Sequence, residues 1–298
     1  MALTEAQRFV LGKVRSRVKY SVGNKTDIPK ILLIKLGAIG ELVLASPFFD
    51  QLREHFPHSE IVLVVGRSSF SVVEHNPNIS RFILADDIDL YCGGLIRRSL
   101  EFFRLIFKLH REEFDLSFVL ERAMPFSLLS CLAGVSVRVG FGLGRKDFFL
   151  THSVSSHRIR NESELYLDLL RKMDIPAVFK KTLYYLSDEE KDFMGLFLER
   201  YGIDREEEVI AIAPGGGEST KRWPWQSYIE LVQRLQNKRA SRVILVGGLS
   251  DRKITNNVIQ ACPSCLDATD LSFGEMASIF QRCNLFIGND RGLHHIAS

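Results

Sequence analysis

The 298-residue chain has little of several features that mark particular classes of protein. It contains 5 Cys and 2 Trp, and its formal net charge is only +3. This small excess does not favour a nucleic-acid partner, since no basic stretch is interleaved with aromatic residues. No apolar run approaches the roughly 18 residues of a membrane span, and the N-terminus lacks the order of a secretory signal. We therefore expect a cytoplasmic globular protein. Hydrophobic residues make up 46% of the chain, which is enough to form two cores.

The cysteines are odd in number and scattered, which indicates reduced, buried thiols and no disulfide framework. Cys262 and Cys265 have the spacing of half a zinc site or of a redox pair. No second CxxC accompanies them. The sequence therefore predicts no metal site here.

Charge is uneven at the start of the chain, where residues 1–28 form a basic leader. The first 25 residues carry six Lys or Arg against the single acid Glu5. Four apolar residues at near-helical spacing give this segment a short stripe: Phe9, Val10, Val14 and Val18. A basic amphipathic helix on a membrane surface and a solvated leader helix both fit, and the absence of tryptophan favours the second slightly.

Beyond the leader, apolar runs alternate with helical patterns. Buried strands are expected at 31–34, 61–65, 82–84, 116–120, 209–213, 243–246 and 285–287. Shorter extended pieces are expected near Arg138 and Phe148, and a long helical pattern runs from Leu95 to Arg111. Ser187 opens a capping box for a helix that ends near Gly202. The alternation indicates parallel sheets wrapped by helices. We expect an α/β fold of two Rossmann-like domains, 29–180 and 181–298, with the ligand in a cleft against the carboxyl ends of both sheets.

A glycine loop follows the strand at 209–213 and precedes a helical pattern. Gly215, Gly216 and Gly217 let a ligand approach the backbone, and amides at a helix start favour negative charge. Lys221 adds a cation suited to a diphosphate. An anion-binding crossover is predicted, with an ordinary glycine-rich surface loop as the alternative.

A second polar loop follows the strand at 31–34. Gly37 and Gly40 lead to Glu41, which stands at the start of a helical pattern. The helix dipole stabilises the ionised form of a carboxylate at this position, which suits a general base that accepts a proton from a hydroxyl. The alternative is that Glu41 only complements the helix dipole.

A third polar loop follows the strand at 285–287. Asp290 is placed to cap the next helix or to bind sugar hydroxyls, and Gly292 and Leu293 lead into that helix. His295 lies one turn further on, where its ring suits contact with a phosphate or with the donor sugar.

Two stretches of the first half are expected to be acceptor-facing loops, 86–98 and 122–130. Five basic residues in or near them suit phosphorylated lipid sugars, although exposed basic residues are usually just solvated: Arg97, Arg98, Arg122, Arg145 and Lys146.

Three motifs occur in order: Gly37-Ala38-Ile39-Gly40-Glu41, Lys221-Arg222-Trp223-Pro224, and the run from Asp290 to Ala297. Through them the chain resembles glycosyltransferase family 9, the ADP-heptose:lipopolysaccharide heptosyltransferases, and Lys-Arg-Trp-Pro is the most specific element. The resemblance implies a GT-B fold and inverting transfer without metal or cofactor. It further implies an ADP-heptose donor in the C-terminal half, a lipid-linked saccharide acceptor in the N-terminal half, and peripheral contact with the cytoplasmic face of the inner membrane.

Carried over by position, Glu41 stands where the family usually has an aspartate as catalytic base. Gly216 and Gly217 replace frequent hydroxyl side chains, and Arg291 replaces a common threonine. The family pattern is matched by Asp290, Gly292 and His295. Family members continue beyond the equivalent of Ser298, so the resemblance implies a truncated second sheet with an unpaired edge. Two alternatives stay open: a donor with another nucleotide, such as a UDP- or GDP-sugar, and a relative that binds nucleotide without catalysis.

Overall fold

The structure is a computed structural model that describes residues 29–142, 144, 147–155, 160–216, 222–239, 241–290 and 292–298. The basic leader lies outside these residues, as do five residues that the sequence analysis singles out: Arg145, Lys146, Gly217, Lys221 and Arg291. The chain divides into two compact units, Met1–Leu183 and Tyr184–Ser298. Each unit is described by itself.

The first unit is built on a six-stranded parallel sheet with the strand order β3-β2-β1-β4-β5-β6. Its strands are β1 (Ile31–Ile34), β2 (Ile61–Gly66), β3 (Arg81–Ala85), β4 (Leu116–Val119), β5 (Val137–Gly142) and β6 (His152–Ser155). Its helices are α2 (Ile39–Leu44), α3 (Ser46–His55), α4 (Asp87–Tyr91), α5 (Leu95–His110), α6 (Met124–Leu132) and α7 (Glu162–Arg171), with short 3₁₀ turns η1 (Arg67–Val72) and η2 (Asp147–Phe149). This is the doubly wound order of a Rossmann fold.

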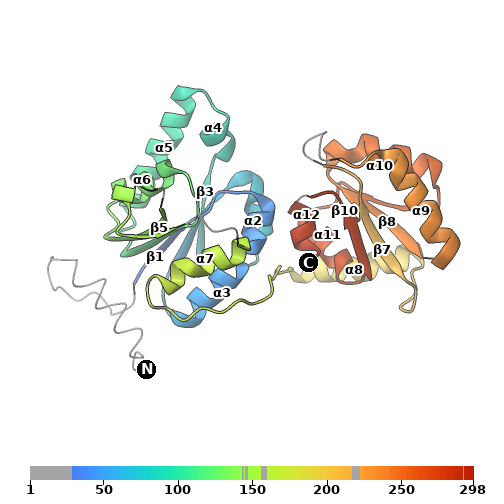
Figure 1. Ribbon diagram of the computed structural model, residues 1–298, viewed down its shortest axis with the longest axis horizontal. Helices are drawn as coiled ribbons and strands as arrows, with labels where there is room; N and C mark the ends of the chain where they lie inside the picture. The colour runs from blue at the N-terminus through green and yellow to red at the C-terminus, as the bar shows by residue number, and fades with distance from the viewer. Residues whose placement is uncertain are drawn as a thin grey trace. The chain divides into compact units, whose positions relative to one another are not determined.

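Helices cover both faces of this sheet (Figure 1). On one face, Leu105 and Leu109 of α5 pack with Leu32 and Ile34 of β1 in one core cluster. On the other, the ring of Phe48 in α3 meets the ring of Phe118 in β4 with centroids 5.3 Å apart. β1, β2 and β4 are buried from both sides, and their sequences are apolar runs interrupted only by Ser117 in β4, which is why they could be predicted.

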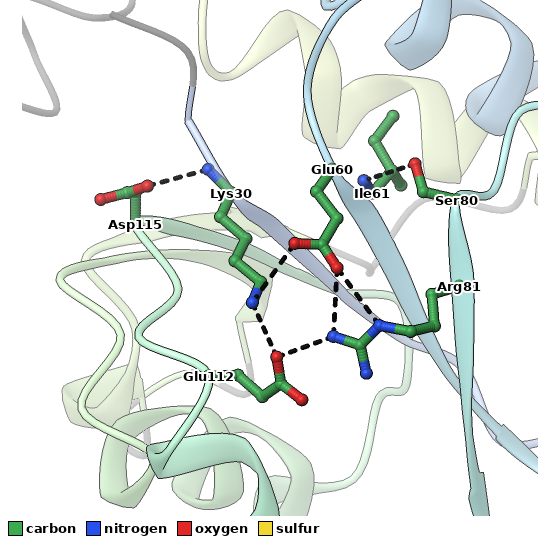
Figure 2. Close-up of polar contacts among 7 residues, drawn as sticks. All are labelled: Lys30, Glu60, Ile61, Ser80, Arg81, Glu112 and Asp115. Atoms are coloured by element: carbon green, nitrogen blue, oxygen red, sulfur yellow. Dashed lines mark hydrogen bonds and ion pairs between the residues drawn. The ribbon is translucent and has the colours of Figure 1, made fainter. Parts of the chain in front are cut away.

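An ionic cluster closes the amino ends of the first three strands (Figure 2). Lys30 Nζ lies 2.7 Å from Glu112 Oε2 and 3.3 Å from Glu60 Oε2. Arg81 Nη2 completes the cluster at 2.7 Å from Glu112 Oε2 and 3.1 Å from Glu60 Oε1. The backbone N–H of Lys30 donates to Asp115 Oδ2 at 2.8 Å. Two cations thus face Glu60 and Glu112 at the edge opposite to the carboxyl ends of the strands.

The second unit repeats the doubly wound plan in a parallel sheet with the described strand order β10-β7-β8-β9. Its strands are β7 (Val209–Ala213), β8 (Arg242–Gly247), β9 (Leu266–Thr269) and β10 (Leu285–Gly288). Its helices are α8 (Asp188–Tyr201), α9 (Trp225–Arg239), α10 (Arg252–Ala261), α11 (Phe273–Phe280) and α12 (Gly292–Ile296), with a 3₁₀ turn η4 (Leu249–Asp251). Among the described strands of this sheet, β10 lies at one edge, and its side chains are less buried than those of β7.

Several predicted elements are confirmed. The capping box at Ser187 is present, with Glu190 as its partner, and the helix ends at Gly202 with a left-handed φ of 58°. Glycine suits this position because other side chains are strained there. All seven predicted strands are found within one or two residues of their expected bounds.

Other predictions are wrong. The expected loops at 86–98 and 122–130 contain α4, the start of α5 and most of α6. β9 was missed because its sequence, Leu-Asp-Ala-Thr, is short and half polar. Cys92 is exposed, whereas the composition predicted buried thiols throughout. Within the part of the chain that the structure describes, no helix is long and apolar enough to span a bilayer.

Candidate functional site

Each sheet has one point where its strand order reverses. In the first unit, β1 lies between β2 and β4; in the second, β7 lies between β8 and β10. The crevice at the carboxyl ends of such strands is where open α/β sheets bind ligands. The loop from Lys35 to Glu41 leaves β1, Gly215 and Gly216 follow β7, and Asp290 follows β10. The described candidate residues therefore fall at the two switch points.

Glu41 lies in the first turn of α2 and is held by a buried lysine. The amino group of Lys35 donates to a carboxylate oxygen of Glu41 and to the carbonyl oxygen of Gly37. It also donates to Glu121 Oε1 at 3.1 Å. The side chains of Lys35, Glu41 and Glu121 are 1%, 47% and 12% exposed. Glu41 thus has a fixed cation on one side and open solvent on the other.

Glu121 joins the two strands of this switch point. It follows β4, and its Oε1 accepts from the backbone N–H of Leu36 at 2.9 Å. A buried ammonium group is costly without a partner, so the two carboxylates stabilise Lys35 inside the protein. Sequence reasoning missed both Lys35 and Glu121. The available signal was a charged residue directly after each of two apolar strands.

Two phenols lie in the field of these carboxylates. Burial raises the pKa of Tyr91, and the charges of Glu121 and Glu41 raise it further. Burial likewise raises the pKa of Tyr166, with Glu41 as the next cause. Neither phenol loses its proton near neutral pH. Glu41 is therefore better suited than either tyrosine to accept a proton at this place.

The second switch point is bridged by an amide. Asn289, directly after β10, donates through Nδ2 to the carbonyl oxygens of Pro214 at 3.1 Å and Gly215 at 2.8 Å. Its Oδ1 accepts from the backbone N–H of Trp223 at 3.0 Å. Arg222 Nε donates to the carbonyl oxygen of Gly216 at 2.6 Å. These contacts fix both ends of the glycine loop, and no pattern in the sequence indicates the part that Asn289 plays.

Gly215 is required by packing. A Cβ on this residue would lie 2.2 Å from the carboxyl carbon of Asp251. Asp251 is buried in η4 and accepts from the backbone N–H of Gly248 at 3.1 Å. The close approach that favours glycine at this position is thus made by a protein side chain, where the sequence analysis expected a ligand.

The loop after β10 places its candidates differently. Asp290 is exposed, whereas the side chain of Leu293 is buried, which leaves only the backbone of Leu293 for a ligand. Gly292 begins α12, and His295 is half-buried near its end. The ring of His295 lies 5.9 Å from that of His294, which in turn lies 6.1 Å from Phe286. Donor contact by these residues stays a prediction.

The Cys262 and Cys265 pair does not have the features of a reactive dithiol. Both thiols are buried at the end of α10, and burial raises the pKa of Cys262 and that of Cys265, the latter to about 12. Redox-active cysteines depend on a lowered pKa. Across the described ranges, no three His, Cys, Asp or Glu side chains gather as a metal site would need.

Comparisons with known proteins agree with this geometry. The sequence model described as "Glycosyltransferase family 9 (heptosyltransferase)" matches residues 102–298. Lipooligosaccharide heptosyltransferase 2 of Haemophilus influenzae is 22% identical over 283 residues, which cover 90% of this chain and 80% of the relative. Lipopolysaccharide heptosyltransferase 3 of Escherichia coli is 21% identical over 268 residues, covering 87% and 77%.

Solved structures show the same fold. A glycosyltransferase of family 9 from Veillonella parvula superposes with a TM-score of 0.80 at 21% identity, covering 90% of this chain and 77% of the other. E. coli heptosyltransferase WaaC with ADP-2-deoxy-2-fluoro heptose gives a TM-score of 0.71 at 14% identity, covering 90% and 85%. The fold is that of the GT-B glycosyltransferases.

Proposed function

Because the chain belongs to glycosyltransferase family 9, we propose that it transfers a heptose from ADP-heptose to a lipid-linked saccharide of the lipopolysaccharide core or a related glycan. The relatives named above act as heptosyltransferases on lipopolysaccharide or lipooligosaccharide. One observation carries the proposal. Glu41 is a half-exposed carboxylate, held by Lys35 at the switch point of the first sheet, where a general base would be expected.

The proposed reaction is a single inverting displacement. A carboxylate oxygen of Glu41 takes the proton of the acceptor hydroxyl, whose oxygen attacks the anomeric carbon of the heptose. The bond from that carbon to the diphosphate oxygen breaks, and ADP leaves with the electron pair. Lys35 fixes the direction of the carboxylate through its hydrogen bond, so that little ordering is needed when the acceptor arrives.

Donor binding is assigned to the second switch point. Backbone amides of the glycine loop, which Asn289 and Arg222 hold in place, would contact the diphosphate. Lys221 is proposed from the sequence to add a cation there. Charge grows on the leaving diphosphate in the transition state, so such contacts lower the barrier in addition to binding the donor. The reaction is proposed to need no metal and no cofactor.

The first test is calorimetric titration of the chain with ADP, UDP and GDP, followed by a transfer assay with ADP-heptose. Preferential binding of ADP and formation of a heptosylated product are the expected results. Preference for UDP or GDP would overturn the donor assignment. Binding of ADP without transfer to any lipopolysaccharide-core acceptor would favour a nucleotide-binding relative without catalysis.

A further inference from the structure

Helix α5 carries an apolar stripe that faces away from the core. The stripe consists of Ile96, Leu100, Phe103 and Phe107, whose side chains are between 56% and 76% exposed. Their spacing of four, three and four residues places them on one face, within an arc of about 60°. Leu105 and Leu109 turn to the opposite face and are buried. The helix is therefore apolar on two sides, of which only one is covered by its own unit.

Neighbouring residues extend the stripe. Leu95 at the start of α5 is exposed, as is Ile88 of the adjoining helix α4. The three connecting residues between α4 and α5 keep the helices side by side (Figure 1). We call the exposed apolar residues of these two helices, which are Ile88, Leu95 and the four stripe residues, the α4–α5 surface. Exposed apolar areas of this extent usually mark an interaction site.

The charges that border the stripe along α5 are positive. The acids of α4 are engaged locally: Asp86 accepts from the backbone N–H of Asp89 at 3.0 Å, and Asp87 accepts from the hydroxyl of Ser68. Arg97, Arg104 and Lys108 follow one edge of the stripe at spacings of seven and four residues, and Arg98 and Arg111 stand near its two ends. The one acid between 95 and 111 is Glu101, which is buried and lies 2.5 Å from Arg104 Nε. Asp89 of α4 lies 3.9 Å from Arg97. The surface thus combines an apolar stripe with a basic border.

We propose that the α4–α5 surface docks the protein onto an anionic membrane. An apolar helix face with a basic edge suits the boundary between headgroups and acyl chains, where it sinks in by about 5–10 Å while Lys and Arg reach the lipid phosphates. A second copy of the chain is a poorer occupant, since two such surfaces would bring like charges together. The charge pattern therefore selects lipid.

The connection between this surface and the candidate base Glu41 rests on the proposed function. The amino end of α4 lies next to the loop that carries Glu41: a Cβ on Gly66 would meet the Leu36 carbonyl oxygen at 2.6 Å and Asp87 Cγ at 2.7 Å. Docking through α4 and α5 would hold the candidate base near the layer from which the sugar of a lipid-linked acceptor emerges.

The experiment is co-sedimentation of the full chain with vesicles of phosphatidylcholine, with and without about one third phosphatidylglycerol. The double substitution Phe103→Ser and Phe107→Ser should weaken binding to the anionic vesicles by about tenfold or more. The matched control is Leu196→Ser with Leu249→Ser, two residues of the second unit that are 65% and 68% exposed. Since all four side chains are exposed, circular dichroism and thermal melting should stay near wild type.

A second pair of variants tests the charge. Arg97→Glu with Lys108→Glu should remove the preference for phosphatidylglycerol, whereas Arg234→Glu with Lys253→Glu, on helices of the second unit, should keep it. A third variant, Arg15→Glu with Arg17→Glu, tests the basic leader. Three outcomes would overturn the proposal. Wild type does not bind the vesicles, or only the leader variant loses binding. In the third, wild type is a dimer in solution and the phenylalanine variant alone is a monomer.

The vesicle assay contains neither donor nor acceptor, so its outcome is independent of the proposed transfer. Activity then tests the link. The phenylalanine variant should lose transfer to a lipid-linked acceptor in vesicles by about tenfold and keep transfer to the same sugar without its acyl chains. Equal loss with both acceptors would overturn the link. Absence of all transfer by wild type would refute the proposed function and leave the vesicle result decisive for the surface.

Discussion

The two switch points occupy the same place in their sheets and are bridged by different chemistry. In the first, Glu121 reaches from the end of β4 to Lys35 and to the backbone of Leu36 after β1. In the second, Asn289 reaches from the end of β10 to the backbone carbonyls after β7. One bridge is ionic and includes a second carboxylate, Glu41, whereas the other is a neutral amide. Topology therefore sets where a site forms, and the bridging side chain sets what the site can do.

Glu41→Gln should have the largest effect on activity. Without a carboxylate, the first switch point keeps its shape and loses its proton acceptor, so kcat should fall by about 10²–10⁴-fold. The dissociation constant of ADP should stay within error, since donor contacts are assigned to the other unit. Turnover and calorimetric binding are measured together, with Glu199→Gln on the exposed face of α8 as control. Normal turnover in the Glu41 variant would falsify the assignment of the base.

Lys35→Met should be the most destabilising change. It leaves Glu121 largely buried without its cation, and removing one partner of such a pair costs about 3–5 kcal/mol. Urea unfolding measures the loss, and kcat should fall as Glu41 loses its fixed partner. The double variant Lys35→Met with Glu121→Gln should recover part of the stability, because the carboxylate that remains without its cation, Glu41, is half-exposed and hydrated. No recovery would show that packing of the lysine stem, and not charge, accounts for the loss.

Asn289→Asp makes the second switch point resemble the first. An ionised carboxylate cannot donate to the Pro214 and Gly215 carbonyl oxygens and would repel both. We expect a loss of stability of about 1–3 kcal/mol and binding of ADP that is at least tenfold weaker. Asn289→Ala removes the same hydrogen bonds without adding charge. A difference between the two variants in the ADP dissociation constant therefore isolates the charge, and equal affinities would contradict its importance.

The comparison also shows what a sequence can reveal. β1 and β7 could be predicted because strands buried on both faces are continuous apolar runs, and the polar loops after them could be placed at the sheet edge. The bridges could not be predicted. Lys35 and Glu121 are 86 residues apart, and Asn289 is 74 residues from Gly215, so their pairing depends on strand order. A hydrophobic pattern gives strand positions and leaves that order open.

α5 shows a further limit of the sequence. Its periodicity predicted a helix, yet apolar residues on two sides of it give no indication of which side meets the sheet. Leu105 and Leu109 pack in the core, whereas Phe103 and Phe107 remain exposed. α4 and α6 were missed because α4 has only 5 residues and α6 is mostly apolar, with a proline in its first turn. Packing in three dimensions decided each case.

We expect the smallest effect on stability from a substitution in the ionic cluster at the opposite edge of the first sheet, where two cations balance two carboxylates. Hydrogen bonds from Lys30, and then from Arg81, hold the pKa of Glu112 below its usual range (Figure 2). A carboxylate whose pKa is lowered in the folded state stabilises that state above its ordinary pKa of about 4.3, and this contribution is lost as pH falls through the lowered value. Glu112→Gln should therefore cost about 1 kcal/mol at pH 7, and less as the pH approaches 3.

Urea unfolding of wild type and Glu112→Gln at several pH values between 7 and 3 measures this convergence. Transfer activity at pH 7 should be unchanged, because the cluster lies at the amino ends of the strands and Glu41 follows the carboxyl end of β1. A stability gap that persists to the lowest pH would show that the glutamate acts by packing. A fall in kcat would couple the two edges of the sheet and contradict the separation of a structural ionic cluster from a catalytic one.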